Sequence, residues 1–277
     1  MKNKIILVKK KIKEVSSALD GMGEIKERIK GRRVVFFLDY DGTLTPIVQR
    51  PEQAVLSVSM RKTLRKLSDL CPVAVISGRD LADVKRMVGL DSIFYAGSHG
   101  FDISGPGNHH IGYQKGLEFI PLLDKAEKDI ENKIKIISGA RIERKKFSLA
   151  VHYREAEDNN VDKVKRAVSE TTKKFPNLRK SSGKKVFEIQ PRVDWNKGKA
   201  LFSILRSLDL DKSHVLPFYI GDDLTDENAF RIIQRIGIGI VVGKNSRVTY
   251  AIYKLKDPDE VEQFLQKMLS LLGVKKQ

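Results

Sequence analysis

The sequence predicts an α/β fold with a buried parallel sheet and a second domain inserted into it. Short, continuous apolar runs such as residues 34–38 alternate with segments of helical periodicity, which is typical of strands buried on both faces between helices. In the middle of the chain this alternation gives way to charged helical stretches and short segments of alternating polarity, and it resumes after Pro191. The same middle segment holds much of the excess positive charge.

The charge distribution indicates where the domains begin and end. The formal net charge of the 277 residues is +17, of which +7 lies in residues 1–33 and +7 in residues 115–190, leaving +3 for the remainder. We therefore expect a basic, helical N-terminal extension at 1–32. We expect a core made of residues 33–114 and 191–277, and an inserted α/β domain at 115–190.

Each element of the core is predicted from a local pattern. Apolar runs indicate strands, and apolar residues three and four apart, as at Met60, Leu64 and Leu67, indicate amphipathic helices. The expected strands are 34–39, 73–76, 94–96, 217–220 and 239–242. The expected helices are 58–70, 80–88, 197–208, 225–233 and 258–272.

The N-terminal and middle segments have different patterns. Ile12, Val15 and Leu19 share one face of the helix expected in the N-terminal extension, and this face packs either on the core or on a partner. In the middle segment, alternating polarity favours a half-exposed antiparallel sheet. Its expected elements are helices at 115–132 and 161–175 and strands at 147–153 and 185–189.

The composition excludes several classes of protein. With a single cysteine, Cys71, the chain has no intramolecular disulfide, which fits a reducing compartment and a cytoplasmic location. The apolar runs are far shorter than the roughly 20 residues of a membrane helix. The net charge is compatible with nucleic-acid binding, but the basic segments lack interleaved aromatic residues, so this function is only a distant alternative.

The segment DYDGTLT, residues 39–45, directly follows the first expected core strand. In an open parallel sheet, the reactive crevice lies beyond the carboxyl ends of the strands. Asp39 and Asp41 are two residues apart on an extended segment, so their side chains can point the same way, and Gly42 allows a sharp turn after them. We interpret Asp39 as a nucleophile that becomes a transient aspartyl phosphate, and Asp41 as the general acid and base beside it.

A second acidic segment, DDLTDE at residues 222–227, follows the strand expected at 217–220. Four carboxylates in six residues repel one another unless a cation is bound, and oxygen ligands of this kind suit Mg²⁺. Asp222 is nearest to the strand and is the stronger candidate for a metal ligand. Asp226 and Glu227 fit equally well as acidic residues that favour a helix N-terminus.

Two smaller motifs offer groups for binding phosphate. Ser77 and Arg79 follow the strand expected at 73–76, where a hydroxyl and backbone N–H groups can hold phosphate oxygens at a helix start. We expect Arg79 to contact the substrate. Lys197 begins the helix expected at 197–208, where its ammonium group can neutralise the phosphate and an adjacent carboxylate.

Together and in this order, these motifs resemble those of the haloacid dehalogenase superfamily, and more closely those of the trehalose-6-phosphate phosphatases. The segments that carry the resemblance are FLDYDGTLTPIV (37–48), ISGR (76–79), YAGSHG (95–100), SLAVHYR (148–154) and GDDLTDE (221–227). The resemblance extends from about Arg33 to the C-terminal helix. It departs at Asn228, where many relatives carry an acidic residue, and this argues against a role for that position in metal binding.

The resemblance implies a Rossmann-like haloacid dehalogenase core with an inserted α+β cap domain. It implies a phosphatase in which Asp39 is the nucleophile and Asp41 the acid and base. Ser77 and Lys197 then hold the transferring phosphoryl group. Because charge spreads over the phosphoryl oxygens in such a transition state, positioning and electrostatics provide most of the catalysis.

The cofactor implied by the resemblance is Mg²⁺. Its ligands in this sequence are then Asp39, the backbone carbonyl of Asp41, and Asp222, with Asp226 close to the ion. No membrane span is expected, and the implied partner is a small phosphorylated disaccharide. Positive charge in the cap suits the attraction of such an anion.

The resemblance also places sugar recognition in the cap. In relatives, a Glu-x-Lys pair and a Lys-x-x-x-Glu pair recognise the glucose hydroxyls, and by position these are Glu143 with Lys145 and Lys184 with Glu188. Charges of both signs suit hydroxyl groups, which both donate and accept hydrogen bonds.

The substrate implied is trehalose 6-phosphate. Phosphatases that act on glucosylglycerate phosphate, mannosylglycerate phosphate or sucrose phosphate share the core motifs and are alternatives, which the cap residues would distinguish. His99 is a candidate for substrate contact. A structural role fits His99 equally well, and the same holds for His152.

Overall fold

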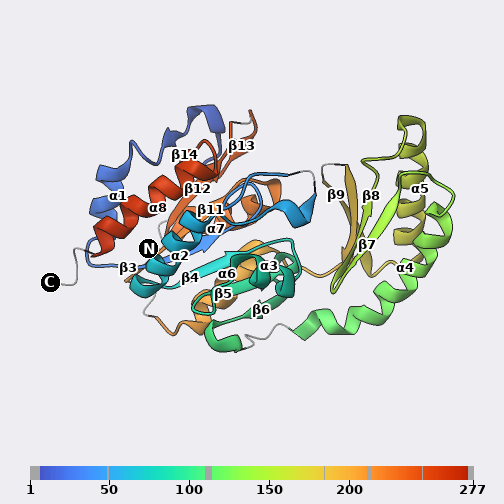
Figure 1. Cartoon of the computed structure of the whole chain (residues 1–277), viewed down its shortest axis with the longest axis horizontal. Coiled ribbons are helices and arrows are strands. Elements are labelled where there is room, and N and C mark those ends of the chain that lie inside the picture. The colour runs from blue at the N-terminus through green and yellow to red at the C-terminus, as the bar shows by residue number, and fades with distance from the viewer. Residues whose placement is uncertain are drawn as a thin grey trace. The chain divides into compact units, whose positions relative to one another are not determined.

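The computed structural model describes residues 7–48, 50–109, 114–183, 185–210, 214–244 and 246–273. The chain forms two compact units (Figure 1). The first comprises Met1–Gly112 and Trp195–Gln277, and the second comprises Tyr113–Asp194. Each unit has its own hydrophobic core. The α/β fold predicted from the sequence is confirmed.

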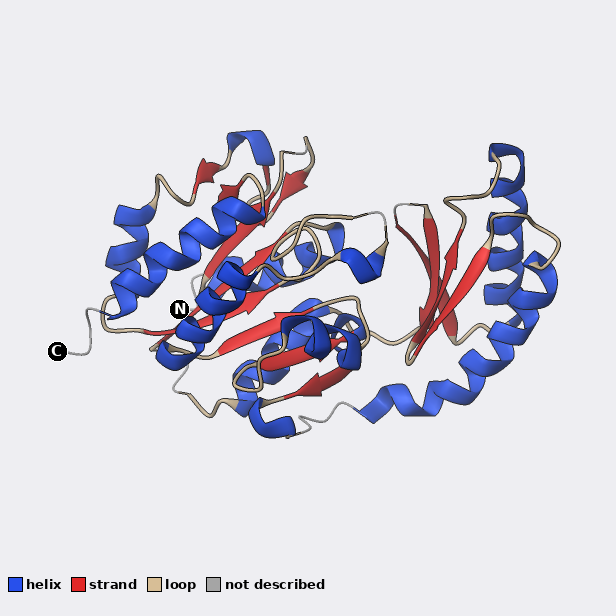
Figure 2. Cartoon of the chain, viewed as in Figure 1, coloured by secondary structure: helices blue, strands red, loops and turns tan. Residues whose placement is uncertain are grey.

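The first unit contains an eight-stranded sheet (Figure 2). In spatial order its strands are β2 (Ser16–Ser17), β14 (Tyr253–Leu255), β12 (Ile238–Val242), β11 (Val215–Gly221), β3 (Arg33–Leu38), β4 (Val73–Ile76), β5 (Phe94–Gly97) and β6 (Asp102–Ser104). Neighbouring strands pair in parallel except β5 and β6, which are antiparallel. The carboxyl ends of β11, β3, β4 and β5 therefore meet at one edge of the sheet.

Helices cover both faces of this sheet. They are α1 (Met22–Ile29), α2 (Val58–Leu70), α3 (Leu81–Val88), α6 (Lys197–Ser207), α7 (Glu227–Ile236) and α8 (Pro258–Gly273). The side-chain alternation of β11 shows the two faces. Phe218 packs against Phe264 of α8 with ring centroids 6.3 Å apart, whereas Tyr219 packs edge-on against Phe230 of α7 at 5.4 Å. The strand is thus buried on both sides, as continuous apolar runs predict.

Side-chain and glycine caps set several helix boundaries. The Ser57 side chain accepts a hydrogen bond from the Met60 backbone N–H at the start of α2, and the Asn196 side chain accepts one from Lys199 at the start of α6. At the end of α3, Gly89 has φ +64°, a left-handed conformation that favours glycine. These caps explain why α2 and α6 begin where the sequence predicts them.

The strands and helices predicted for the core are confirmed, with small shifts at their ends. One difference is that the helix expected at 225–233 begins as the 3₁₀ turn η6 (Leu224–Asp226) and continues as α7. The strands β6, β14, β2, β1 (Lys10–Lys11) and β13 (Val248–Thr249) are not predicted. Each has only two or three residues, which is too short for a periodic pattern.

The second unit has a four-stranded antiparallel sheet in the order β7-β8-β10-β9. Its elements are η5 (Gln114–Phe119), α4 (Ile120–Ile134), β7 (Arg141–Lys145), β8 (Ser148–His152), α5 (Asp158–Lys174), β9 (Leu178–Gly183) and β10 (Val186–Pro191). Leu149 and Val151 of β8 and Phe187 and Ile189 of β10 lie in one core with α4 and α5. The sequence does not predict β7 and β9, because each contains only one apolar residue.

Asp129 joins α4 and α5 in this unit. One oxygen accepts hydrogen bonds from Lys133 (2.8 Å) and from the Thr171 hydroxyl (2.7 Å), and the other accepts one from Lys174 (2.6 Å). Burial raises the pKa of Asp129, but these hydrogen bonds outweigh it and hold the pKa well below its usual range. The ionised form is therefore the stabilising one.

We expect Asp129→Asn to lower the free energy of unfolding of the second unit by about 1–2 kcal/mol, measured by urea titration at pH 7. Because the pKa is lowered in the folded state, this stabilisation is fully present above the unfolded-state pKa of about 3.9 and is lost as the pH falls below it. The difference between wild type and variant should therefore shrink below pH 4. Asp162→Asn, at an exposed site on α5, serves as control, and an equal loss there would contradict the role of Asp129.

The N-terminal segment differs from the expected single helix. Among its described residues, 7–32, only α1 is an α-helix, whereas residues 10–17 include β1, the 3₁₀ turn η1 (Ile12–Glu14) and β2. Ile12 and Val15 are buried, and β2 pairs with β14 of the large sheet. The helical prediction for residues 12–19 is therefore wrong. Pairing with short strands more than 200 residues away in the chain overrides the local helical pattern.

Across the described ranges, no helix is long and apolar enough to cross a membrane.

Candidate active site

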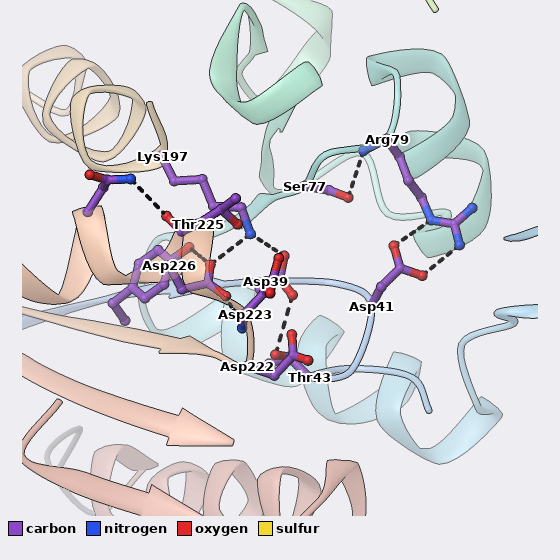
Figure 3. A network of polar contacts seen from close by, with 12 residues as sticks. Asp39, Asp41, Thr43, Ser77, Arg79, Lys197, Asp222, Asp223, Thr225 and Asp226 are labelled. Atoms are coloured by element: carbon purple, nitrogen blue, oxygen red, sulfur yellow. Dashed lines mark hydrogen bonds and ion pairs between the residues drawn. The ribbon is translucent and has the colours of Figure 1, made fainter. Parts of the chain in front are cut away.

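Side chains from three separate sequence motifs meet at the carboxyl edge of the parallel sheet (Figure 3). Asp39 follows β3, Asp222 follows β11, and Lys197 is the first residue of α6. Because β3 and β11 pair in parallel, with Leu38 opposite Ile220, the chain segments that carry the two aspartates leave the sheet side by side. The arrangement gathers acidic and basic groups at one buried point.

Lys197 connects two buried carboxylates. Its Nζ lies 2.7 Å from Asp39 Oδ1 and 2.7 Å from Asp226 Oδ1, and the Lys197 side chain is only 3% exposed. Burial lowers the pKa of Lys197, but Asp226 and Asp39 outweigh it and raise the pKa above its ordinary value. Lys197 is therefore a fixed positive charge beside Asp39.

The oxygens of Asp226 are largely occupied by protein donors. Oδ1 accepts hydrogen bonds from Lys197 and from the Tyr219 hydroxyl (2.6 Å), and Oδ2 accepts one from the Asp223 backbone N–H (2.8 Å). Burial, together with Asp226, raises the pKa of Tyr219 well above its ordinary value, so the hydroxyl keeps its proton. Asp226 is thus better placed to orient Lys197 than to bind an ion directly.

Asp222 has the features of a metal ligand. Its Oδ1 is buried and has no hydrogen-bond partner among the described residues. Gly42, with φ +83°, lies against its carboxylate, and a Cβ at that position would come within 2.3 Å of Asp222 Oδ2. Burial, followed by repulsion from Asp226, raises the pKa of Asp222 to about 6.

The donor set fits a divalent cation. Asp39, Asp222 and Asp226 each have one oxygen within 4.8 Å of the others, and of the three Asp226 is the one whose oxygens both already accept hydrogen bonds from the protein. Burial raises the pKa of Asp39 well above its ordinary value, because the attraction of Lys197 only partly offsets it, and Asp226 and Asp222 raise it further. Buried carboxylates that repel one another are stabilised by a cation, and oxygen ligands of this type suit Mg²⁺.

Asp41 is oriented differently from the sequence prediction. Its carboxylate is not directed at Asp39 but accepts two hydrogen bonds from Arg79, from Nε at 2.7 Å and from Nη2 at 2.6 Å (Figure 3). Arg79 Nη2 also donates to the Pro51 carbonyl at 2.8 Å, and its guanidinium lies 5.5 Å from the centre of the Tyr40 ring. The predicted acid and base and the predicted substrate-binding arginine are therefore paired with each other.

Ser77 and His99 lie on neighbouring strand ends. Ser77 follows β4 and is buried, and its hydroxyl accepts a hydrogen bond from the Arg79 backbone N–H at 3.1 Å. The His99 backbone N–H donates to the Ser77 carbonyl at 2.8 Å. Gly78 permits this packing, because a Cβ there would lie 2.8 Å from His99 Cε1. Ser98 and His99 both have positive φ (50° and 57°), a strained conformation for residues with side chains.

The candidate sugar-binding residues form one face of the second unit's sheet. Glu143 and Glu188 both pair with Ala150 of the central strand β8, so all three point to the same face. The side chains of Lys145 and Ser148 share that face, because they pair with each other two residues further along. The opposite face carries the apolar residues that pack on the helices.

Polar contacts hold this face in place. His152 Nε2 lies 2.7 Å from Glu143 Oε2, the Ser148 hydroxyl donates to Glu188 Oε1 at 2.9 Å, and Lys145 Nζ lies 3.7 Å from Glu188 Oε1. The hydrogen bond with His152 lowers the pKa of Glu143 below its ordinary value, although burial partly opposes it. The second predicted lysine, Lys184, lies outside the described residues.

Two residues near the site are not predicted from the sequence. Tyr219 is a polar residue in an otherwise apolar strand, and a buried tyrosine hydroxyl needs a hydrogen-bond partner. The sequence therefore did contain a signal that a polar group lies close to Tyr219. Arg247 donates a hydrogen bond to the Asp222 backbone carbonyl. It belongs to no recognisable motif, and only the folded chain brings it to the site.

Comparison with known proteins identifies similar sequences. The family model described as trehalose-phosphatase matches residues 37–259. The chain is 42% identical over 270 residues to a protein described as probable trehalose-phosphate phosphatase H of Arabidopsis thaliana, covering 92% of this chain and 77% of that protein. It is 40% identical over 274 residues to trehalose 6-phosphate phosphatase RA3 of Zea mays, covering 94% of this chain and 76% of that protein.

Solved structures show the same similarity. The C-terminal domain of a trehalose-6-phosphate phosphatase from C. albicans superposes with a TM-score of 0.77 at 25% identity, covering 92% of this chain and 98% of that one. A trehalose-6-phosphate phosphatase related protein superposes with a TM-score of 0.76 at 26% identity, covering 88% of this chain and 100% of that one. A haloacid dehalogenase-like hydrolase from Bacteroides thetaiotaomicron shares the fold, with a TM-score of 0.61 at 16% identity.

Proposed function

Because this chain belongs to the trehalose-phosphatase family, we propose that it hydrolyses trehalose 6-phosphate to trehalose and inorganic phosphate with the help of Mg²⁺. Members of this family are phosphoric monoester hydrolases, and so is this protein. The observation that carries the proposal is the buried group of Asp39, Lys197, Asp222 and Asp226 at the carboxyl edge of the sheet. This group combines a nucleophile, a fixed positive charge and oxygen ligands for a cation.

In the first step, an oxygen of Asp39 attacks the phosphorus atom and the bond from phosphorus to the sugar oxygen breaks. The sugar oxygen takes a proton from Asp41 as it leaves, and Asp39 becomes an aspartyl phosphate. In the second step, a water molecule attacks phosphorus and gives a proton to Asp41. The bond from phosphorus to the Asp39 oxygen then breaks, which releases phosphate and restores the Asp39 carboxylate, while Asp41 is again protonated and ready to act as an acid.

This chain's own residues supply most of the electrostatic stabilisation. Lys197 and the Ser77 hydroxyl hold the phosphoryl oxygens, and Asp226 with Tyr219 keeps Lys197 oriented. When bound, Mg²⁺ would be held by the carboxylates of Asp39 and Asp222 and the Asp41 carbonyl, and it would neutralise phosphoryl charge. Such preorganised charge is the main source of catalysis in phosphoryl transfer.

The pairing of Arg79 with Asp41 suggests a role for Arg79 in this mechanism. In the structure, Asp41 holds both oxygens against the Arg79 guanidinium, so it must leave this pair before it can protonate the sugar oxygen. A phosphate dianion competes for the same guanidinium, because Arg binds both groups through paired N–H donors. We infer that arrival of the substrate phosphate releases Asp41 for catalysis.

The polar face of Glu143, Lys145, Ser148 and Glu188 supports sugar recognition by the second unit. It offers donors and acceptors within a short distance of one another, as sugar hydroxyls require. The net charge of +7 on residues 115–190 favours the approach of a phosphorylated disaccharide. The buried, unpaired thiol of Cys71 supports a reducing, cytoplasmic location.

A phosphate-release panel tests the proposed substrate. With Mg²⁺, we expect kcat/KM for trehalose 6-phosphate to exceed that for sucrose phosphate, glucosylglycerate phosphate and mannosylglycerate phosphate by about 100-fold, since mispaired polar groups disfavour the wrong sugar. Glu188→Ala should lower kcat/KM for the preferred sugar while sparing p-nitrophenyl phosphate, and the exposed Glu131→Ala should change neither. Higher kcat/KM for another sugar phosphate would overturn the substrate assignment, and full activity in EDTA would overturn the Mg²⁺ requirement.

A further inference from the structure

The N-terminal segment clamps the loop that follows β12. Strand β1 pairs with β13, with Lys10 opposite Thr249 and Lys11 opposite Val248. The Ile12 backbone N–H then donates to the Arg247 carbonyl at 3.0 Å. A few residues later, β2 pairs in parallel with β14. Residues 10–17 therefore bond to both ends of the loop that runs from Arg247 to β14.

Side chains strengthen this clamp. Gln234 of α7 accepts a hydrogen bond from the Val8 N–H (2.9 Å) and donates to the carbonyls of Val8 (2.7 Å) and Tyr250 (2.9 Å). The Lys9 ammonium group lies 4.7 Å from the centre of the Tyr250 ring. The Tyr250 N–H donates to Glu227 at 2.9 Å. Residues 8 and 9, α7 and the loop thus form one connected group of polar contacts.

The clamped loop reaches the candidate metal site through Arg247. Strands β11 and β12 pair in parallel, with Gly221 opposite Val241, so the loop after β12 lies at the same sheet edge as Asp222. Arg247 Nη2 donates a hydrogen bond to the Asp222 backbone carbonyl. Gly42 lies against the carboxylate of the same residue. The Asp222 backbone is therefore held by Arg247, and Gly42 leaves room for its carboxylate.

We propose that Arg247 is a positioning residue for the metal site, and that residues 8–17 act through it to hold Asp222 in place. This inference rests on the proposed Mg²⁺-dependent function. It gives a function to the basic N-terminal segment, for which the sequence alone predicts none. Partners in the second coordination sphere commonly control metal affinity by orienting the ligands.

The sign of the effect separates positioning from simple electrostatics. Arg247 carries a positive charge close to a cation site, so removing the charge alone would make a metal ion bind more tightly. Removing the hydrogen bond that orients Asp222 would make it bind more weakly. A weaker metal affinity in a neutral Arg247 variant can therefore be attributed to the loss of positioning.

The test measures Mn²⁺ binding to the purified full chain by electron paramagnetic resonance. We expect Arg247→Ala to raise the Kd for Mn²⁺ about tenfold and Arg247→Lys to recover part of the loss. Arg28→Ala is the matched control, because Arg28 Nη2 donates to the Gly237 carbonyl at 3.0 Å, at the opposite end of β12. It should bind Mn²⁺ like the wild type.

The contribution of the N-terminal segment is tested at Ile12. Ile12 is the first residue of η1, a position whose backbone accepts proline. Ile12→Pro removes both the buried side chain and the N–H that donates to Arg247, whereas Ile12→Ala removes only the side chain. We expect Ile12→Pro to raise the Kd for Mn²⁺ about threefold more than Ile12→Ala does.

The outcomes distinguish this inference from the proposed function. If the wild type binds no Mn²⁺, both are overturned. If the wild type binds Mn²⁺ but Arg247→Ala binds it equally well or more tightly, only the positioning role is overturned. An equal loss in Arg28→Ala would show a general effect of stability and would also overturn it. The melting temperature of each variant without metal is measured alongside. If Arg247→Ala fails to fold, the equally neutral Arg247→Gln takes its place, with the same expected loss of Mn²⁺ affinity.

Discussion

Asp39→Asn is expected to reduce turnover of the sugar phosphate by about 10⁴-fold or more while the protein remains folded. The amide oxygen can still accept the hydrogen bond from Lys197, but an amide is far too weak a nucleophile to form the phosphoryl intermediate. Asn has nearly the same size and shape as Asp, and Lys197 keeps its ion pair with Asp226 at 2.7 Å. The variant should therefore keep its free energy of unfolding within about 1 kcal/mol of the wild type.

Two measurements make this prediction specific. Acid-quenched reactions with ³²P-labelled substrate should leave protein-bound label on the wild type and none on Asp39→Asn. Asp69→Asn, at an exposed site on α2, should retain wild-type kcat. If Asp39→Asn keeps more than a few per cent of wild-type kcat, Asp39 is not the nucleophile.

Lys197→Met is expected to have the second-largest effect. It removes the positive charge between Asp39 and Asp226, and we expect kcat to fall by about 10²–10³-fold because the phosphoryl oxygens lose a preorganised partner. The two carboxylates also lose their shared ion pair inside the protein. Breaking a buried pair from one side commonly lowers stability by about 3–5 kcal/mol.

The two effects of Lys197→Met can be measured separately. The loss of stability is obtained from urea unfolding without metal, and the loss of kcat is measured well below the melting temperature of the variant. Lys197→Arg should not restore activity, because a guanidinium does not fit a site in which one Nζ contacts two oxygens at 2.7 Å. The exposed Lys62→Met serves as control, and a kcat for Lys197→Met equal to that of the control would contradict the role.

Much of the fold follows from local patterns. The apolar runs that became β3, β4 and β11, and the periodic segments that became α2 and α6, contain enough residues to display their period. The short strands β1, β2, β13 and β14 do not, because two or three residues show no periodicity. Local periodicity therefore predicts a helix in the N-terminal segment, whereas residues 10–18 in fact pair with residues 247–254.

The candidate site, like the fold, can be predicted from the sequence only in part. Asp39, Asp222 and Lys197 could be selected from the sequence because each stands at the end or start of a recognisable element, and parallel strand ends converge. The pairing of Asp41 with Arg79 could not be predicted. It depends on side-chain conformations and on the Pro51 carbonyl and the Tyr40 ring nearby.

The sequence by itself determined the α/β fold, the family and the identity of the groups at the sheet edge, because these depend on periodicity and on short contiguous motifs. Only the tertiary structure decided how those groups are held. It showed that Asp226 is occupied by Lys197 and Tyr219, that Asp41 is turned towards Arg79, and that Arg247 reaches Asp222. Hydrogen bonds between residues distant in the chain depend on where the backbone places each donor and acceptor, and no local pattern encodes that placement.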